Sequence, residues 1–98
     1  MDSLDSNLLL PYASKYIWWK TPEEAITMPQ RVIAQVMNIG DYDDVYALNA
    51  ALGDDIFRET IHLAEAGQFS DKSWHYWHYR LGLAKLEEVP PLPVRSFS

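Results

Sequence analysis

Glycine and proline punctuate this sequence at intervals that leave room only for short structural elements. Gly40, Gly53 and Gly67 each follow a stretch in which apolar residues recur at helical spacing, and glycine is typical of the position just after a helix. Acidic or hydroxyl residues come soon after each glycine, where their oxygens can cap the amide groups of a first turn. Residues 21–24, Thr-Pro-Glu-Glu, form a capping box with proline at the first helical position. These signals together predict a series of short helices.

We expect an all-α fold, a compact bundle of five or six short helices. No stretch of the sequence alternates apolar and polar residues over the length of a strand, and the short connections favour antiparallel neighbours. In the fourth expected helix, Val45, Leu48 and Leu52 share the core face, with Tyr46 as a further candidate. Periodicity and caps place the helices at residues 6–18, 22–27, 29–39, 42–52, 55–66 and 71–83.

Composition narrows the class of protein further. A chain of 98 residues corresponds to one domain, and the absence of cysteine excludes a disulfide scaffold, thiolate catalysis and cysteine-based metal sites. The formal net charge of −6 disfavours binding to nucleic acid and suits a partner with a basic surface. The apolar patch at 8–10 has the features of neither a signal peptide nor a membrane span, so we expect no membrane partner. The lack of cysteine fits a cytoplasmic location.

The chain changes character toward its C-terminal end. We expect a helical domain over residues 1–86 and an extended proline-rich tail over 87–98, because proline removes backbone donors and favours extended geometry. A polyproline segment loses little conformational entropy on docking, so the tail supplies candidate partner contacts. Two alternatives stay open, namely that the tail packs on its own helices or stays disordered. The candidate contacts are Leu92, Val94, Arg95 and Phe97.

The four tryptophans fall into two pairs with different expected roles. We expect one indole of Trp18 and Trp19 to pack against the core, and the other to stay exposed as a partner-contact anchor near the tail contacts. Further along the chain, Trp74, Trp77 and His78 share one face of a helix. That face is either part of the core or an aromatic binding platform for a peptide or a base, and we favour the core.

Polar clusters give weak grounds for chemistry. His62, His75 and His78 match no recognised zinc motif, so we expect surface or rim histidines, with a metal site as the alternative. The carboxylates at 41–44 and 54–55 follow helix-ending glycines, which favours capping over Mg²⁺ binding or acid–base catalysis. No phosphate-binding loop, nucleophile elbow or dinucleotide fingerprint occurs in the sequence. We therefore expect no enzymatic activity, no cofactor and no bound metal.

Several motifs recur in a recognisable order. An aromatic segment leads into the capping box and is followed by Arg-Val-Ile-Ala at 31–34, Gly-Asp-Tyr-Asp-Asp at 40–44, Gly-Asp-Asp at 53–55 and the stretch 73–82. This order resembles a small uncharacterised family of bacterial helical proteins, over about residues 16–83. Some members are encoded beside nucleotidyltransferase-type abortive-infection toxins, and an antitoxin role is suspected for them. The resemblance implies a cytoplasmic bacterial protein that acts by binding another protein, and it carries no catalytic residues.

The sequence as a whole therefore predicts a protein–protein interaction module, with an antitoxin-like partner of a nucleotidyltransferase-type toxin as the specific form. One alternative is a small DNA-binding regulator with a helix-turn-helix, although its Lys and Arg residues are scattered rather than arranged in a stripe. A second alternative is a helical domain with a metal site. Homo-oligomerisation stays open as well, because a short aromatic-rich chain can leave an apolar patch exposed.

Overall fold

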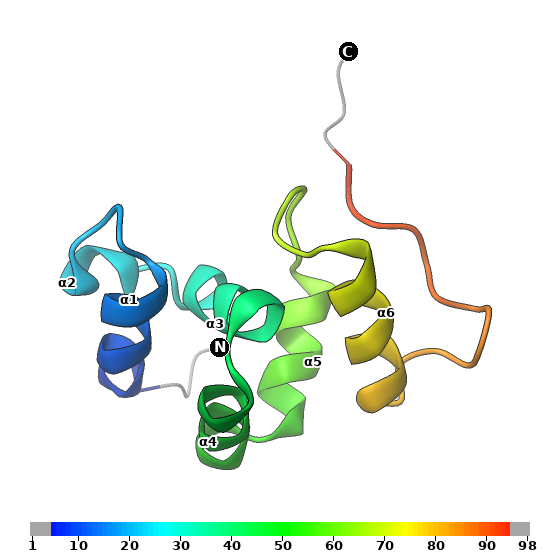
Figure 1. Cartoon of the computed structure of the whole chain (residues 1–98), viewed down its shortest axis with the longest axis horizontal. Helices are drawn as coiled ribbons and strands as arrows, with labels where there is room; N and C mark the ends of the chain where they lie inside the picture. Colours follow the sequence, from blue (N-terminus) through cyan, green and yellow to red (C-terminus); the bar gives the residue numbers. More distant parts are fainter. Residues whose placement is uncertain (1–4, 95–98) are drawn as a thin grey trace.

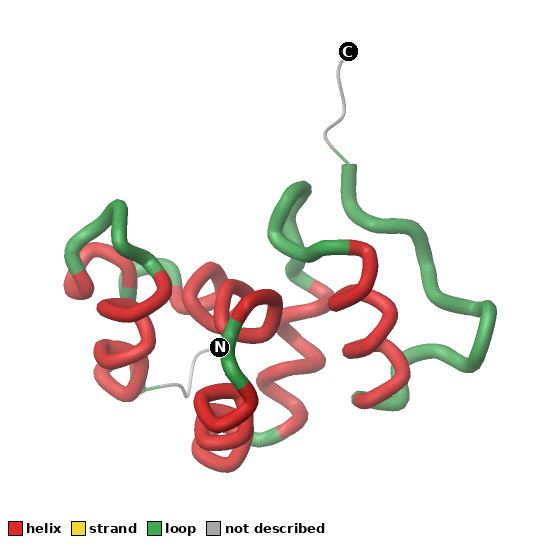
Figure 2. The backbone as a smooth tube through the Cα atoms, viewed as in Figure 1, coloured by secondary structure: helices red, strands yellow, loops and turns green. Residues whose placement is uncertain are grey.

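The computed structural model describes residues 5–94, which fold into a helical bundle without β-strands (Figure 1, Figure 2). One short 3-10 turn, η1, precedes six α-helices. Across residues 5–94, no helix is both long and apolar enough to cross a membrane. The predicted all-α class is confirmed for this part of the chain. The elements are η1 (Ser6–Leu9), α1 (Leu10–Tyr16), α2 (Pro22–Ala25), α3 (Pro29–Ile39), α4 (Tyr42–Leu52), α5 (Asp54–His62) and α6 (Asp71–Arg80).

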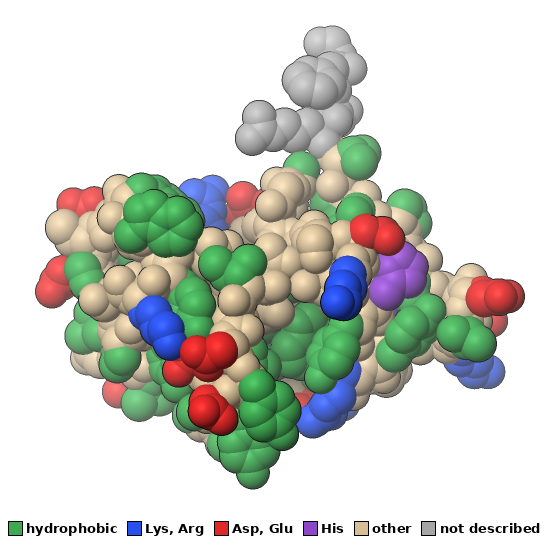
Figure 3. Space-filling model, in the orientation of Figure 1, with side chains coloured by type: hydrophobic (Ala, Val, Ile, Leu, Met, Phe, Trp, Pro, Cys, Tyr) green, Lys and Arg blue, Asp and Glu red, His purple; other side chains and the backbone are tan. Residues whose placement is uncertain are grey.

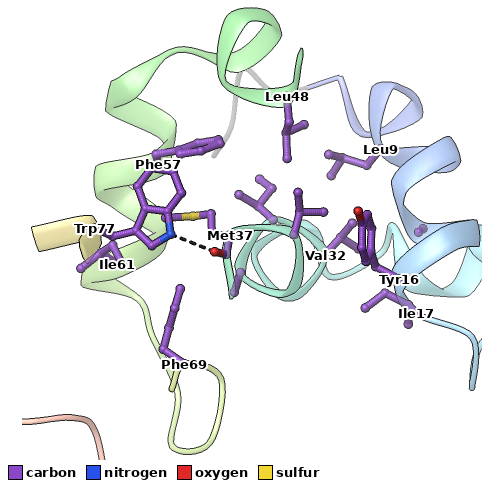
Figure 4. Close-up of a cluster of buried hydrophobic side chains, with 14 of the residues drawn as sticks. Leu9, Tyr16, Ile17, Val32, Met37, Leu48, Phe57, Ile61, Phe69 and Trp77 are labelled. Carbon is purple, nitrogen blue, oxygen red and sulfur yellow. Dashed lines mark hydrogen bonds between the residues drawn. The ribbon is translucent and has the colours of Figure 1, made fainter. Parts of the chain in front are cut away.

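Helix α3 lies at the centre of the bundle and contacts every other helix. Its buried residues point in several directions around the helix axis, which a helix packed on only one neighbour would not require. Figure 4 shows α3 with the side chains of α1, α4 and α5 converging on it. The buried apolar residues of α3 are Val32, Ile33, Ala34, Val36 and Met37.

Side-chain caps begin three of the helices as the sequence predicts. The Thr21 hydroxyl accepts a hydrogen bond from the Glu24 amide at 3.2 Å at the start of α2. The Asp41 carboxylate accepts from the Asp44 amide at 2.9 Å at the start of α4. Ser70 does the same at the start of α6. Each cap satisfies an amide that has no partner within its own helix, so these polar residues have a structural reason to follow one another at helix boundaries.

The predicted first helix, 6–18, is wrong in both continuity and length. The segment begins as the 3-10 turn η1 and becomes α-helical only at Leu10, because Pro11 has no amide hydrogen and is tolerated only in a first turn. Helix α1 then ends at Tyr16, where Ile17 adopts φ −119° and ψ 67° and turns its buried side chain toward the core. The two tryptophans that follow are therefore outside the helix.

The three glycines expected after helices behave differently from one another. Gly53 adopts a left-handed φ of 87° between α4 and α5, as predicted. Gly40 follows α3 with an ordinary φ of −64°, and it is required for space, since a Cβ atom there would lie 2.4 Å from the Val36 carbonyl oxygen. Gly67 lies in a loop beyond α5, which ends at His62 rather than at residue 66 as predicted.

Helix α6 closes the core through hydrogen bonds to the C-terminal end of α3. The indole N–H of Trp77 donates to the Met37 carbonyl at 2.9 Å, and the Ser73 hydroxyl donates to the Asn38 carbonyl at 3.2 Å. Carbonyl groups in the last turn of a helix lack partners of their own, so these bonds satisfy buried acceptors that would otherwise destabilise the fold. Trp74 is buried as well, and the prediction that this aromatic face belongs to the core is confirmed.

Candidate functional site

Trp18 and Trp19 lie in the connection between α1 and α2 and project from the surface. Their side chains are 72% and 57% exposed, and the two rings meet edge to face with their centroids 4.8 Å apart. The expectation that one indole packs against the core is wrong, because Tyr16 and Ile17 occupy the core positions next to them. Within residues 5–94, neither indole N–H has a hydrogen-bond acceptor. The pair is therefore an apolar surface with two free donors.

A groove of about 360 Å³ runs beside this pair, between the α1–α2 connection, α2, α3 and the loop after α5. Trp19 and the half-exposed Met28 stand on its rim, and the buried side chains of Ile17, Ala25 and Val32 line its base. The apolar base and the aromatic and thioether rim groups suit apolar side chains of a partner, while charged and polar side chains line the rest of the walls.

Hydrogen bonds fix the loop that forms the far wall of this groove. Gln30 and Gln68 exchange reciprocal amide bonds of 2.8 and 2.9 Å, which tie the loop to the start of α3. The Arg31 guanidinium pairs with the Glu65 carboxylate through two contacts of 3.2 and 3.4 Å. The wall is therefore preformed, and a partner entering the groove would not have to order it.

A cluster of charged groups joins α1 to the start of α4. The Lys15 ammonium lies 2.6 Å from the Asp44 carboxylate and 3.0 Å from that of Asp41, and the Tyr16 hydroxyl donates to Asp44 at 2.6 Å. The bonds from Lys15 and Tyr16 hold the pKa of Asp44 below its usual value. The Asp44 amide and Lys15 likewise lower the pKa of Asp41, while burial and the bond to Asp44 raise the pKa of Tyr16.

These contacts give the carboxylates at 41–44 a structural role, as the capping prediction proposed. At the second carboxylate cluster, Asp54 accepts a hydrogen bond from the side-chain amide of Asn49 at 2.9 Å, and Asp55 forms an ion pair with Arg58 at 2.8 Å. Because Lys15, Arg31 and Arg58 are each bound to an acidic residue, they do not form a basic surface for nucleic acid. The DNA-binding alternative therefore gains no support from them.

The three histidines lie in different environments. His62 is exposed at the end of α5, and His75 is half-buried with its Nδ1 atom 2.9 Å from the Asp71 carbonyl. The expectation of a surface or rim position is wrong for His78, which is buried on the core face and bound to the Trp74 carbonyl at 2.7 Å. Among the residues that the structure describes, no three histidine, aspartate or glutamate side chains form a group that could hold a metal ion.

The predicted tail contacts that the structure describes lie apart from the tryptophan pair. Leu92 is partly buried against the core, and Val94 is exposed, while Arg95 and Phe97 lie outside the described residues. Figure 1 shows the orange to red segment beside α6 and the α1–α2 connection on the other side of α3. The expectation that Trp18 and Trp19 neighbour the tail contacts is therefore wrong for Leu92 and Val94.

Sequence reasoning missed a second surface, where three tyrosines border the space between α4 and α6. Tyr42, Tyr46 and Tyr76 are 80%, 67% and 54% exposed. Tyr46 was an expected core candidate, but the core side of α4 is occupied by Leu48, which is fully buried. The spacing of Tyr42 and Tyr46, one turn apart, is the signal in the sequence that they share a face of the helix.

Comparison with known proteins does not place the chain in a family: no protein-family model, no curated protein and no solved structure matches it. The geometry above is therefore the basis for any assignment of function, and the resemblance to antitoxin-like proteins rests on the sequence motifs alone. The class that the fold and surfaces define is a small helical domain with two exposed aromatic surfaces.

Proposed function

We propose that the protein acts by binding another protein through its tryptophan face, defined as Trp18, Trp19 and the adjoining groove with Met28 on its rim. The observation that carries the proposal is the exposure of two neighbouring indoles that fill no core position and have no hydrogen-bond acceptor in the described part of the chain. Tryptophan is the residue type most enriched among the energetically dominant residues of protein interfaces. Two adjacent exposed indoles are costly in water unless a partner covers them.

Charge specifies the kind of surface that fits this face. Glu23 and Glu24 occupy the first turn of α2 next to the tryptophan pair, where Lys20 supplies one opposing charge, and no ion pair engages any of these three side chains within the described residues. Together with the net charge of −6, these carboxylates favour a partner that presents basic side chains around an apolar centre. The sequence resemblance supplies a specific candidate, a nucleotidyltransferase-type toxin that the protein would neutralise by binding.

The test is co-expression with a nucleotidyltransferase-type toxin of the kind encoded beside some members of the family that the sequence resembles, followed by measurement of growth and of affinity between the purified proteins. We expect the double substitution Trp18→Ala and Trp19→Ala to weaken binding by about 30-fold or more, the effect of losing an interface residue worth about 2 kcal/mol. Tyr79→Ala, which removes an exposed ring from α6, is the matched control and should leave the affinity unchanged.

Two results would count against the proposal. If the double variant neutralises the toxin and binds it as the unchanged protein does, the tryptophan face is not the contact surface. If the unchanged protein neither binds nor neutralises the toxin, the antitoxin-like form of the proposal is wrong. Circular dichroism of both variants would establish that each one is folded before binding is compared.

A further inference from the structure

A second groove, separate from the tryptophan face, lies between α4 and α6. It consists of two adjoining hollows of about 410 and 230 Å³ that share Tyr42, Val45, Tyr76 and Trp77 in their walls. We call this surface the tyrosine groove. Its base is apolar, because Trp77 is buried and Val45 packs against the core. Figure 3 shows hydrophobic side chains gathered over α4 and α6, with Lys and Arg side chains beside those of α6.

The walls of the tyrosine groove are aromatic and lie on two rigid helices. Tyr42 and Tyr46 stack one helical turn apart on α4, with centroids 6.2 Å apart and planes inclined by 22°. Tyr76 stands on α6 with its ring edge-on to Trp77 at 5.0 Å. Tyrosine rings held in this way present broad contact area at a small entropic cost, and their hydroxyl groups stay available as donors and acceptors.

A basic side chain marks each of the two hollows. Lys72 lines the larger one and Arg80 the smaller one, and both residues are exposed. In residues 5–94, neither side chain forms an ion pair. Their backbone positions are eight residues apart on α6, which corresponds to about 12 Å along the helix axis. The groove is therefore apolar and aromatic in the middle, with one cation toward each end.

We propose that the tyrosine groove binds an extended segment of a partner protein that is apolar or proline-rich in the middle and carries two acidic side chains about four residues apart. An extended or polyproline chain advances by about 3.1–3.4 Å per residue, so four residues span the separation of Lys72 and Arg80. Aromatic-lined grooves are the surfaces on which proline-rich segments dock. This surface and its ligand are distinct from the tryptophan face and do not depend on the function proposed for that face.

Two other occupants fit the groove less well. A helical segment advances only about 1.5 Å per residue, so its acidic side chains would have to lie about eight residues apart, and its backbone groups would be bonded internally rather than to the tyrosine hydroxyls. Single-stranded nucleic acid also stacks on aromatic rings, but it carries a charge at every nucleotide, whereas this groove offers only two separated cations on a chain of net charge −6. Two isolated acidic side chains match the two cations one to one.

The experiment is a titration of the full-length protein with a fluorescein-labelled synthetic peptide, Gly-Glu-Pro-Leu-Pro-Glu-Gly, followed by fluorescence anisotropy and by NMR shifts of the tyrosine rings. We expect saturable binding with shifts at Tyr42, Tyr46 and Tyr76. Replacing both glutamates of the peptide by glutamine should weaken binding by about 10-fold, the combined effect of two partly exposed ion pairs of somewhat under 1 kcal/mol each. Tyr42→Ala with Tyr46→Ala should weaken it by about 10-fold or more.

A charge exchange separates recognition from simple loss of structure. The variant Lys72→Glu, Arg80→Glu should lose the glutamate peptide and bind a peptide with lysine at both positions, while Lys20→Glu, Lys85→Glu is the control with the same net charge and should behave as the unchanged protein does. Absence of saturable binding, equal affinity for the glutamine peptide, or lysine peptide binding without the exchange would overturn the proposal.

Competition experiments address the remaining occupants. Oligodeoxythymidylate that displaces the glutamate peptide at equal or lower concentration would identify nucleic acid as the better ligand and overturn the proposal. Stronger binding of a peptide with the sequence of residues 87–98 would assign the groove to a second copy of this chain and would equally overturn it. If neither competitor displaces the glutamate peptide, the result supports an acidic, extended segment of a different protein as the ligand.

Discussion

The two pairs of tryptophans in this protein have the same side chain and opposite surroundings. Trp74 and Trp77 on α6 are buried, and each indole N–H donates to a backbone carbonyl, that of Pro90 at 2.8 Å and that of Met37 at 2.9 Å. Trp18 and Trp19 are exposed, touch each other, and donate to no acceptor in the described residues. The difference shows that burial of an indole here goes together with satisfaction of its donor.

Position relative to the helices explains this difference. Trp77 lies within α6 on the face that meets α3, so the direction of its side chain is set by the helix and by the core. Trp18 and Trp19 follow the end of α1, and the core positions there are already occupied by Tyr16 and Ile17. A stable fold accounts for the first pair but gives no reason for the second, which is why the second pair is the better candidate for function.

The largest effect we predict is for Trp77→Ala. This change removes a buried ring that packs edge to face against Phe57 at 5.3 Å and leaves the Met37 carbonyl without its donor. We expect the free energy of unfolding to fall by about 3–5 kcal/mol, the usual cost of truncating a buried aromatic side chain to alanine. Urea denaturation followed by circular dichroism measures it. A loss below about 1 kcal/mol would mean that the indole is not a core residue.

Substitution of the buried tryptophans by phenylalanine should have a smaller effect on stability, and it separates ring packing from hydrogen bonding. Trp77→Phe keeps an aromatic ring but leaves a buried carbonyl unsatisfied, so we expect a loss of about 1–3 kcal/mol in the free energy of unfolding. Trp74→Phe should cost less, about 0.5–1.5 kcal/mol, because its acceptor belongs to the exposed Pro90, whose carbonyl water can reach. Equal losses in the two variants would show that the hydrogen bond to Met37 adds nothing to ring packing.

The burial of the tryptophan pair on α6 was predictable from the sequence, because it depends on periodicity and caps. The spacing of Trp74 and Trp77 on one helical face places both indoles in the core, and the cap at Asp41 follows from a carboxylate placed just before a helix. Such signals are local, since they depend on residues within one or two turns of each other.

The two exposed aromatic surfaces were only partly predictable from the sequence, because they depend on contacts between distant segments. The sequence predicts a helix end near Trp18 and Trp19, but not that the helix stops at Tyr16 and that Ile17 takes the core position beside them. Likewise, the tyrosine groove exists only because α4 and α6, far apart in the chain, both border the same hollows. Helical spacing on α4 placed Leu48 inward but could not decide whether Tyr46 joins it.

The stability contributed by the charged cluster that joins α1 to α4 should depend on pH, whereas that of the neutral hydrogen bonds of α6 should not. The folded-state pKa values of Asp41 and Asp44 lie below the usual 3.8, so the unfolded chain binds more protons near that pH. The stability that these carboxylates contribute is present above pH 3.8 and is lost as the pH falls through their folded-state values. At the alkaline end, the raised pKa of Tyr16 predicts a loss of stability as the pH rises above its usual value of 10.0.

Thermal unfolding between pH 2 and pH 7 would measure the loss of stability at acid pH in the unchanged protein and in Asp44→Asn. The variant should be less stable than the unchanged protein at neutral pH, by less than either Trp77 variant, and the two curves should converge as the pH falls. Asp43→Asn is the matched control, since that carboxylate lies one residue away and forms no ion pair in the described part of the chain. A stability difference between the two proteins that stays constant from pH 2 to pH 7 would show that the Asp44 carboxylate is not the source of the pH dependence.

The smallest effect on stability is expected where we predict the largest effect on binding. Trp18→Ala and Trp19→Ala should each change the free energy of unfolding by no more than about 0.5 kcal/mol, because the side chains are mostly in water in the folded protein and lose few contacts beyond each other. Urea denaturation of the two single variants, compared with Trp77→Ala, measures this contrast directly. A loss above about 2 kcal/mol would mean that the exposed pair stabilises the fold after all. In that case, loss of partner binding in the double variant would follow from unfolding, and the tryptophan face would have to be tested by substitutions on the groove rim such as Met28→Ala.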